Sequence, residues 1–294
     1  MTAPQMSAAP ADPARKPTDD EIDVYGLTHP GKVRKENQDN FLICALRKQM
    51  VVQQTSLPMP ENLMAESQRL ALVMMVADGV GGGAKGEEAS RLALEAVSHY
   101  VSGSLRCYYA AAAGDDRELS EALEAAAGQS HAELLRRGQE NAEYRGMATT
   151  LTLYLGVWPR AYLLQVGDSR CYLLRDDKLV QITRDQTMAQ ELIDLGVLTR
   201  TDASDTRLAH TLSSSLGGRQ TAPVVTRMDL AWGNVVLLCS DGLIRHVSDE
   251  RIRHHLRAMT SAKQVCEDLV EEALEGGGTD NVTVIVRRAV LSET

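Results

Sequence analysis

Short apolar runs bounded by polar turns recur along the chain and predict buried β-strands. The clearest runs cover residues 71–77, 161–166 and 235–239. Other segments alternate between apolar and polar positions, or place a few apolar residues between turn formers, and predict further strands. These segments are residues 21–27, 41–45, 148–157, 171–174, 179–182, 224–230 and 282–286.

Apolar residues at helical spacing predict helices between these groups of strands. The first helix follows a glycine-rich stretch and runs to about residue 101, with Leu92, Ala93, Ala96 and Val97 on one face. The others cover residues 117–137, 188–195, 249–259 and 262–274. Because adjacent strands form hairpins and pairs of helices separate them, the order of elements indicates an α+β fold with antiparallel sheets.

The remaining segments define the limits of one domain. Residues 1–20 are rich in Ala, Pro and polar side chains without periodicity, which is typical of a disordered tail. No repeat or linker interrupts residues 21–289, so we expect a single domain there and a short tail over residues 290–294. Residues 47–70 predict a long loop between strands, and residues 199–218 a polar surface flap.

Charge and composition narrow the classes of partner. The 294-residue chain has a formal net charge of −9, which argues against nucleic acid and anionic membrane surfaces. No apolar stretch reaches the roughly 18 residues of a membrane span, and the N-terminus lacks the apolar core of a signal peptide. The five cysteines show no C-x-x-C spacing and several lie in apolar runs, as in a reducing compartment. These features predict a cytoplasmic protein.

Carboxylates stand beside Gly, Ser or Asn where apolar strands begin or end. They are Asp39, Asp78, Asp168, Asp241 and Asp280. One Asp-Gly pair by itself is more typical of a turn than of a ligand. If these strands share sheets, however, the carboxylates gather at one edge, and gathered carboxylates repel one another unless a cation lies between them. Ligands that are all oxygen favour Mg²⁺, Mn²⁺ or Ca²⁺ over zinc or copper.

The glycine-rich stretch after Asp78 allows other interpretations. Gly81, Gly83 and Gly86 spell G-x-G-x-x-G, a pattern found in dinucleotide sites. A carboxylate just before this loop would repel a pyrophosphate, and residues 105–107 supply no acidic ligand for a ribose. A plain glycine-rich turn with one capping Asp is the simplest alternative.

Two divalent ions in a carboxylate cluster would lower the pKa of a bridging water until it is hydroxide near neutral pH. A nearby guanidinium would then hold a phosphate through two parallel hydrogen bonds. Arg34 lies in the polar loop before Asp39 and is the leading candidate for this role.

An ordered set of motifs resembles the metal-dependent protein phosphatases, the PPM or type 2C family, in their compact bacterial form. The resemblance covers about residues 21–289. The motifs are RKENQD at 34–39, ADGVGG at 77–82, GMATT at 146–150, VGDSR at 166–170, CSDGL at 239–243 and GTDN at 278–281. Each motif is modest alone, but their order and spacing together are specific.

The resemblance implies a fold and an activity. The fold is a four-layer α-β-β-α sandwich of two antiparallel sheets flanked by helices, with a metal centre at one edge. The activity is hydrolysis of phosphoserine and phosphothreonine by a metal-activated water at a binuclear Mg²⁺ or Mn²⁺ centre. The implied partners are phosphorylated proteins, substrates of a Ser/Thr kinase, and the expected state is a monomer.

The resemblance also assigns roles to single residues. Asp78, Asp241 and Asp280 would bind one ion, and Asp78 with the Gly79 carbonyl would bind the second. Asp39 would act through metal-bound water. Arg34 would hold the substrate phosphate, and Asp168 would serve a weaker third ion.

Several positions depart from the family pattern. Gly83 and Val80 stand where members carry a His, so the usual candidate for the general acid is missing. Ile244 and Arg245 occupy a region where many members have an Asp that helps Asp168 with the third ion. The two-metal core is complete in the sequence. The alternative is a phosphatase-like regulatory or phosphoprotein-binding module with weak or no turnover.

Overall fold

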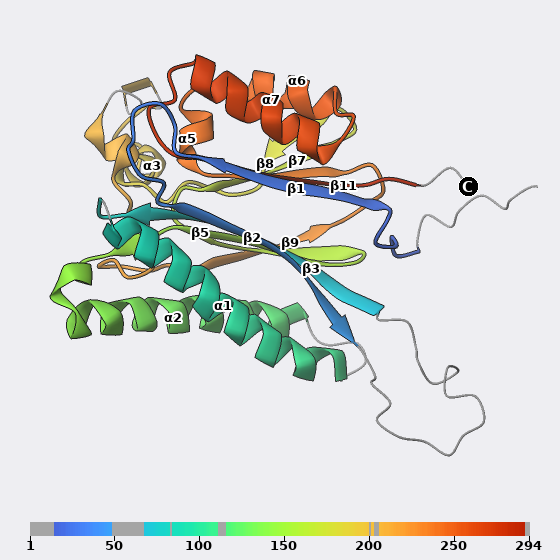
Figure 1. Cartoon of the computed structure of the whole chain (residues 1–294), viewed down its shortest axis with the longest axis horizontal. Helices are drawn as coiled ribbons and strands as arrows, with labels where there is room; N and C mark the ends of the chain where they lie inside the picture. The colour runs from blue at the N-terminus through green and yellow to red at the C-terminus, as the bar shows by residue number, and fades with distance from the viewer. Residues whose placement is uncertain are drawn as a thin grey trace, which may run out of the picture.

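Two antiparallel β-sheets lie face to face between two layers of helices (Figure 1). The computed structural model describes residues 15–48, 68–82, 84–110, 116–199, 201–202 and 206–291. The α+β class and the four-layer sandwich predicted from the sequence are confirmed.

The two sheets draw their strands from distant parts of the chain. The first sheet has the order β1-β11-β10-β7-β8, and the second has the order β2-β3-β5-β6-β9, with β4 paired to β3. The first contains β1 (Ile22–His29), β7 (Arg170–Arg175), β8 (Lys178–Gln181), β10 (Val235–Cys239) and β11 (Val282–Ala289). The second contains β2 (Asp39–Lys48), β3 (Gln68–Val80), β4 (Ala148–Thr149), β5 (Leu151–Val157), β6 (Arg160–Val166) and β9 (Val224–Asp229).

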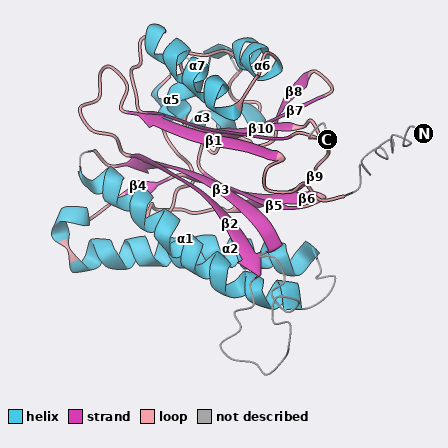
Figure 2. Ribbon diagram, turned by 45° about the vertical axis from the view of Figure 1, so that its right-hand side comes forward, coloured by secondary structure: helices cyan, strands magenta, loops and turns pink. Residues whose placement is uncertain are grey.

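Helices cover the outer face of each sheet (Figure 2). The second sheet is covered by α1 (Ala84–Ala110) and α2 (Asp116–Glu140), and η2 (Ala142–Tyr144) follows them. The first sheet is covered by α5 (Asp241–Ile244), α6 (Asp249–Arg257) and α7 (Ala262–Glu275). The flap contains η3 (Arg207–His210) and is preceded by α3 (Met188–Asp194). Among the described helices, none combines the length and the apolar character that crossing a membrane requires.

Side-chain alternation along the strands builds three apolar layers. In β3, Val73 and Met75 pack toward α1 and α2, while Met74 and Val76 face the other sheet. In β11 the same period of two sends Val284 toward the helices of the first sheet. Strands that are buried on both faces read as continuous apolar runs, which explains why residues 71–77 and 235–239 were recognisable.

The ends of β3 and α1 differ from those predicted. Strand β3 continues through Asp78 and Gly79 to Val80, because Gly79 pairs with Thr149 of β4, so Asp78 lies inside a strand. Helix α1 extends to residue 110. Residues 49–67, most of the predicted long loop, lie outside the described residues.

The last residues of the predicted N-terminal tail contact strand β3. Residues 1–14 lie outside the described residues, whereas residues 15–20 pack against the start of β3. Arg69 donates to the Pro17 carbonyl oxygen at 2.5 Å and to an Asp19 carboxylate oxygen at 2.6 Å. Residues 15–20 of the predicted tail thus contact the sandwich in the structure, and the boundary at residue 20 stays a prediction.

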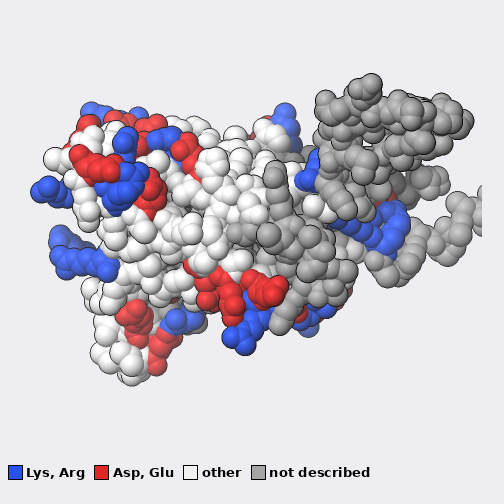
Figure 3. All heavy atoms as spheres, turned by 90° about the horizontal axis from the view of Figure 1, so that it is seen from below, with Lys and Arg blue, Asp and Glu red and all other residues white. Residues whose placement is uncertain are grey.

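Acidic and basic side chains are interspersed on the face that carries α1 and α2 (Figure 3). Arg91 forms ion pairs with Glu88 at 2.8 Å and with Glu95 at 2.6 Å, at helical spacings of three and four residues. Such pairs keep the outer face of a helix polar and contribute little to stability.

A substitution at Leu153 tests the apolar layer between the second sheet and its helices. Its side chain is fully buried, so Leu153→Ala should lower the free energy of unfolding by about 2–5 kcal/mol. The matched control is Leu195→Ala, since Leu195 is 75% exposed and should change stability by only about 0.5 kcal/mol. Urea unfolding followed by circular dichroism measures both, and equal losses would contradict this assignment of the core.

Candidate metal centre

The second sheet brings two of the predicted carboxylates together. Asp39 at the start of β2 and Asp78 near the end of β3 are direct cross-strand partners in the antiparallel register. Carboxylates directly opposite each other on neighbouring strands repel one another. The pairing therefore needs a compensating positive charge or protonation.

The first sheet positions two more of the predicted carboxylates, Asp241 and Asp280. Asp241 begins α5 directly after β10, and Asp280 precedes β11, the neighbour of β10. A Cβ added at Gly242 would lie 1.9 Å from the Asn281 carbonyl oxygen, so only glycine lets these two loops pack this closely. The four carboxylates thus meet at one edge of the sandwich, as the sequence predicted.

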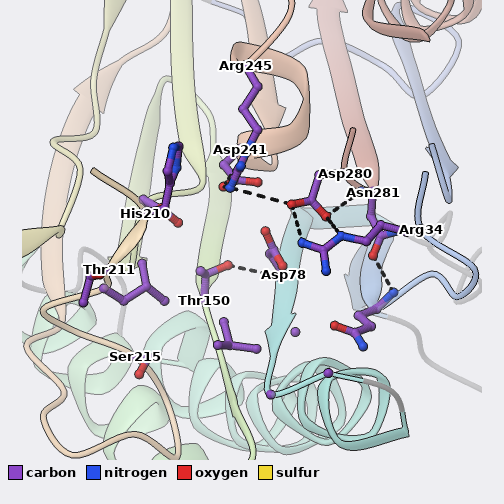
Figure 4. A pocket seen from close by; sticks show the side chains of 17 residues that line it. Arg34, Asp78, Thr150, His210, Thr211, Ser215, Asp241, Arg245, Asp280 and Asn281 are labelled. Carbon is purple, nitrogen blue, oxygen red and sulfur yellow. Dashed lines mark hydrogen bonds and ion pairs between the residues drawn. The ribbon is translucent and has the colours of Figure 1, made fainter. Parts of the chain in front are cut away.

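Asp78, Asp168, Asp241 and Asp280 line one cavity of about 500 Å³ (Figure 4). Arg34 and Arg245 line it as well. The remaining lining residues are Gln38, Gly79, Val80, Gly81, Gly82, Thr150, His210, Thr211, Leu212, Ser215 and Asn281.

Asp39 is buried just beneath this cavity. One of its oxygens, Oδ2, accepts hydrogen bonds from Ser240 Oγ and Thr283 Oγ1, both at 2.7 Å. The other, Oδ1, is buried and has no hydrogen-bond partner. Burial raises the pKa of Asp39 to about 7, and the charges of Asp241 and Asp280 add to this rise.

Asp78 is fixed through its backbone. Its N–H donates to Thr150 Oγ1 at 3.0 Å, and its carbonyl oxygen accepts from Thr149 Oγ1 at 2.8 Å. Burial and then the Asp39 charge hold the pKa of Asp78 well above its ordinary value. A Cβ at Gly79 would lie 2.0 Å from the Gly86 carbonyl oxygen, so the backbone beside Asp78 needs glycine.

Asp168 lies between β6 and β7 and is also buried. Burial and then the Asp241 charge raise its pKa to about 8. Gln186 holds the preceding residue: its Oε1 accepts from the Gly167 N–H at 2.7 Å, and its own N–H donates to the Gly167 carbonyl oxygen at 3.1 Å. Sequence reasoning gave Gln186 no such role, because the contact spans 19 residues.

Both arginines at the cavity contact predicted metal ligands. Arg34 forms a two-point ion pair with Asp280, in which Nε lies 2.8 Å from Oδ1 and Nη2 donates to Oδ2 at 2.9 Å. Arg245 donates from Nε to Asp241 Oδ2 at 3.1 Å, and its Nη2 lies 3.7 Å from Asp280 Oδ2. The guanidinium groups therefore act as counter-ions of Asp241 and Asp280 in this structure (Figure 4).

The residues present fit a hard divalent cation. Across the described residues, no three His, Cys, Asp or Glu side chains form a ready-made ligand set, since Asp241 and Asp280 are turned toward arginines. The donors are nevertheless all oxygen, and the buried Asp39 Oδ1 has no partner. An ion here would replace the guanidinium groups as the counter-charge.

Two further residues of the site were missed by sequence reasoning in these roles. Asn281 ties the Arg34 loop to β11, donating from Nδ2 to the Pro30 and Glu36 carbonyl oxygens at 3.0 and 2.9 Å. His210 of η3 lines the cavity from the flap side. The flap reads as an irregular polar segment, so no periodic signal marked His210.

Comparisons with known proteins all match this chain to protein phosphatases. The model of the family described as "Protein phosphatase 2C" matches residues 62–276. The serine/threonine protein phosphatase PstP of Mycobacterium tuberculosis is 38% identical over 224 residues, covering 75% of this chain and 41% of PstP. The chain therefore spans less than half the length of PstP. The serine/threonine phosphatase Stp of Listeria innocua is 27% identical over 215 residues, covering 73% of this chain and 83% of Stp.

Solved structures agree with this comparison. A crystal structure of M. tuberculosis PstP superposes with a TM-score of 0.72 at 32% identity, covering 92% of this chain and 99% of that one. The PstP catalytic domain solved in complex with two manganese ions superposes with a TM-score of 0.68 at 32% identity, with the same coverage. The resemblance inferred from the motifs is confirmed, and the chain belongs to the protein phosphatase 2C family.

Proposed function

We propose that this chain is a metal-dependent protein serine/threonine phosphatase that uses two Mn²⁺ or Mg²⁺ ions. One observation carries the proposal: Asp78 from one sheet and Asp241 and Asp280 from the other line one cavity beside Arg34, and Asp39 is the cross-strand partner of Asp78. The two manganese ions of the PstP catalytic domain support it, because that structure shares the fold at 32% identity.

Asp78, Asp241 and Asp280 would hold one ion, and Asp78 with the Gly79 carbonyl would hold the second. These ions would supply a water that is deprotonated near neutral pH and so can serve as the nucleophile. Asp39, fixed by Ser240 and Thr283, would orient that water through its unpartnered Oδ1.

The substrate phosphate would lie between Arg34 and the ions. Once Asp280 binds metal, the Arg34 guanidinium is free to take a phosphate through the same two parallel N–H groups that now hold Asp280. His210 stands at the flap side of the cavity, where it would donate a proton to the departing serine or threonine oxygen. Asp168 would serve a weaker third ion.

The substrates would be phosphoproteins made by a Ser/Thr kinase. The cytoplasmic location and the monomeric state stay predictions from the sequence. The second candidate, a phosphoprotein-binding module with weak turnover, is favoured by one observation: Arg245 contacts Asp241, a ligand that turnover needs.

Phosphate release from a phosphothreonine peptide separates the two functions. Turnover with Mn²⁺ or Mg²⁺ that EDTA abolishes is the result expected of the enzyme. Peptide binding without release of phosphate, at saturating metal, would overturn the proposal in favour of the binding module.

Asp241→Asn should remove turnover while the fold persists. Replacing residues that merely orient metal ligands costs about 10–100-fold in affinity, so losing a ligand should cost at least the upper value. Manganese binding by calorimetry and peptide hydrolysis measure the effect. Asp229→Asn is the matched control, because Asp229 is 73% exposed and remote from the cavity. Near-normal hydrolysis by Asp241→Asn at saturating Mn²⁺ would contradict the assignment.

Arg34→Ala should raise KM about 10–100-fold, the equivalent of a charge-assisted hydrogen bond worth roughly 1.5–3 kcal/mol. Its manganese affinity should not fall, because Arg34 competes with the metal for Asp280. Steady-state kinetics and calorimetry separate these effects. Arg117→Ala, at a side chain 80% exposed, serves as the control. If Arg34→Ala keeps the wild-type KM, Arg34 is only a partner of Asp280.

Arg245→Gln should tighten manganese binding roughly 2–5-fold, since it frees Asp241 from a partly exposed ion pair worth about 0.5–1 kcal/mol. Because the contact is with Asp241, the gain should survive in an Asp168→Ala background. Arg257→Gln, which removes a pair with the distant Asp177, is the control. Loss of the gain in the double variant would show that Arg245 acts through the third site instead.

A further inference from the structure

A group of basic side chains lies at the end of the sandwich opposite the metal centre. Arg69 stands at the start of β3 and Arg287 near the end of β11, whereas the metal-site ends of these strands carry Asp78 and Val282. Lys16 from the N-terminal segment completes the group. Together with Tyr154 they line a small cavity that has no acidic residue in its lining.

Arg287 is the central observation. It is 2% exposed, and its Nε and Nη1 are buried without a hydrogen-bond partner. A guanidinium stays charged at every ordinary pH. Leaving such a charge buried and unpaired is costly, so buried charges in proteins are normally paired with an opposite charge.

Tyr154 offers a second unpartnered donor to the same cavity. Its side chain is fully buried and its hydroxyl has no hydrogen-bond partner. A Cβ at Gly156 would lie 3.0 Å from this hydroxyl oxygen, so the glycine leaves room for the ring. Burial raises the pKa of Tyr154, which keeps the hydroxyl protonated. Tyr154 is therefore a donor and not a counter-ion for Arg287.

The carboxylates nearby are engaged elsewhere. Asp19 accepts from Arg69 at 2.6 Å and also pairs with Arg47, and Glu21 accepts from Arg15 at 2.6 Å. Burial and then the Arg69 charge lower the pKa of Lys16. Asp19 therefore pairs with Arg69, but none of the described residues neutralises the charge of Arg287.

The size of the cavity limits which ion could neutralise the charge of Arg287. Its volume of about 10 Å³ has room for one small species, a water molecule or a monatomic ion. Phosphate and carboxylates are excluded because they bring several heavy atoms. A water molecule would satisfy the donors but would leave the charge of Arg287 unpaired.

We propose that this cavity binds one monatomic anion of chloride size, held by Nε and Nη1 of Arg287 and the hydroxyl of Tyr154. The anion would fasten the N-terminal segment and both sheets at this end of the sandwich. The proposal is independent of the phosphatase chemistry, because the site shares no residue with the metal centre.

Unfolding of the full chain in EDTA tests the proposal without any readout of activity. Urea midpoints are measured at increasing sodium chloride and, separately, at increasing sodium gluconate, and the two series are compared at equal ionic strength. A ligand that binds only the folded state raises stability with its concentration. The midpoint should therefore rise with chloride and stay flat with gluconate. Equal responses to both salts would overturn the proposal and leave a buried water in the cavity.

Variants assign the effect to this cavity. Arg287→Met should abolish the chloride dependence, and Tyr154→Phe should weaken it. The matched control is Arg288→Met, which removes the neighbouring arginine that donates to Met259 and Thr260 carbonyl oxygens. This control should keep the wild-type response.

Bromide provides a second test should Arg287→Met fail to fold. Crystals grown in sodium bromide should show an anomalous peak between Arg287 and Tyr154. A chloride response that survives in Tyr154→Phe at full size, together with no bromide peak at this position, would place the anion elsewhere and overturn the proposal.

Discussion

The structure depends on the gathering of like-charged carboxylates at one edge of two packed sheets. Asp39 and Asp78 face each other across a strand pair, and Asp241 and Asp280 approach from the opposite sheet. Their environment favours protonation, since the pKa values of Asp39 and Asp78 are raised mainly by burial. Such an arrangement needs protonation or a compensating positive charge, so the fold itself favours a bound cation.

Two kinds of counter-charge compete for that place. Arg34 donates to a carboxylate oxygen of Asp280, and Arg245 donates to one of Asp241. A divalent ion would need the same oxygens as ligands. Metal affinity is then the difference between an ion's bonds to these oxygens and the ion pairs that it displaces. Under the proposed function Arg34 would be the more useful competitor, because the displaced guanidinium would gain a phosphate partner in the same cavity, whereas no such role follows for Arg245 from its position.

Local sequence patterns predicted many of the strands and helices. They did not predict which strands pair or which distant side chains meet. Apolar runs marked β3 and β10 because both are buried on both faces, and Asp-Gly steps marked the loops beside them. The glycines after Asp78 suggested a turn directly after it, but pairing with β4 extends the strand through Gly79 to Val80. The partners of Arg34 and Asn281 lie more than 240 residues away in sequence, where no periodicity reaches. Helix α5 has only four residues, too few for an apolar repeat.

The layer between the sheets is polarised along its length. Its middle is apolar, its metal end carries buried carboxylates and its far end carries Arg287 and Arg69. Neither charged end can be neutralised by the other, because the apolar middle separates them along the full length of β3 and β11. Each end therefore needs its own partner of opposite sign. Divalent cations would meet that need at the carboxylate end, and the same argument supports the proposed anion at the end where Arg287 is buried.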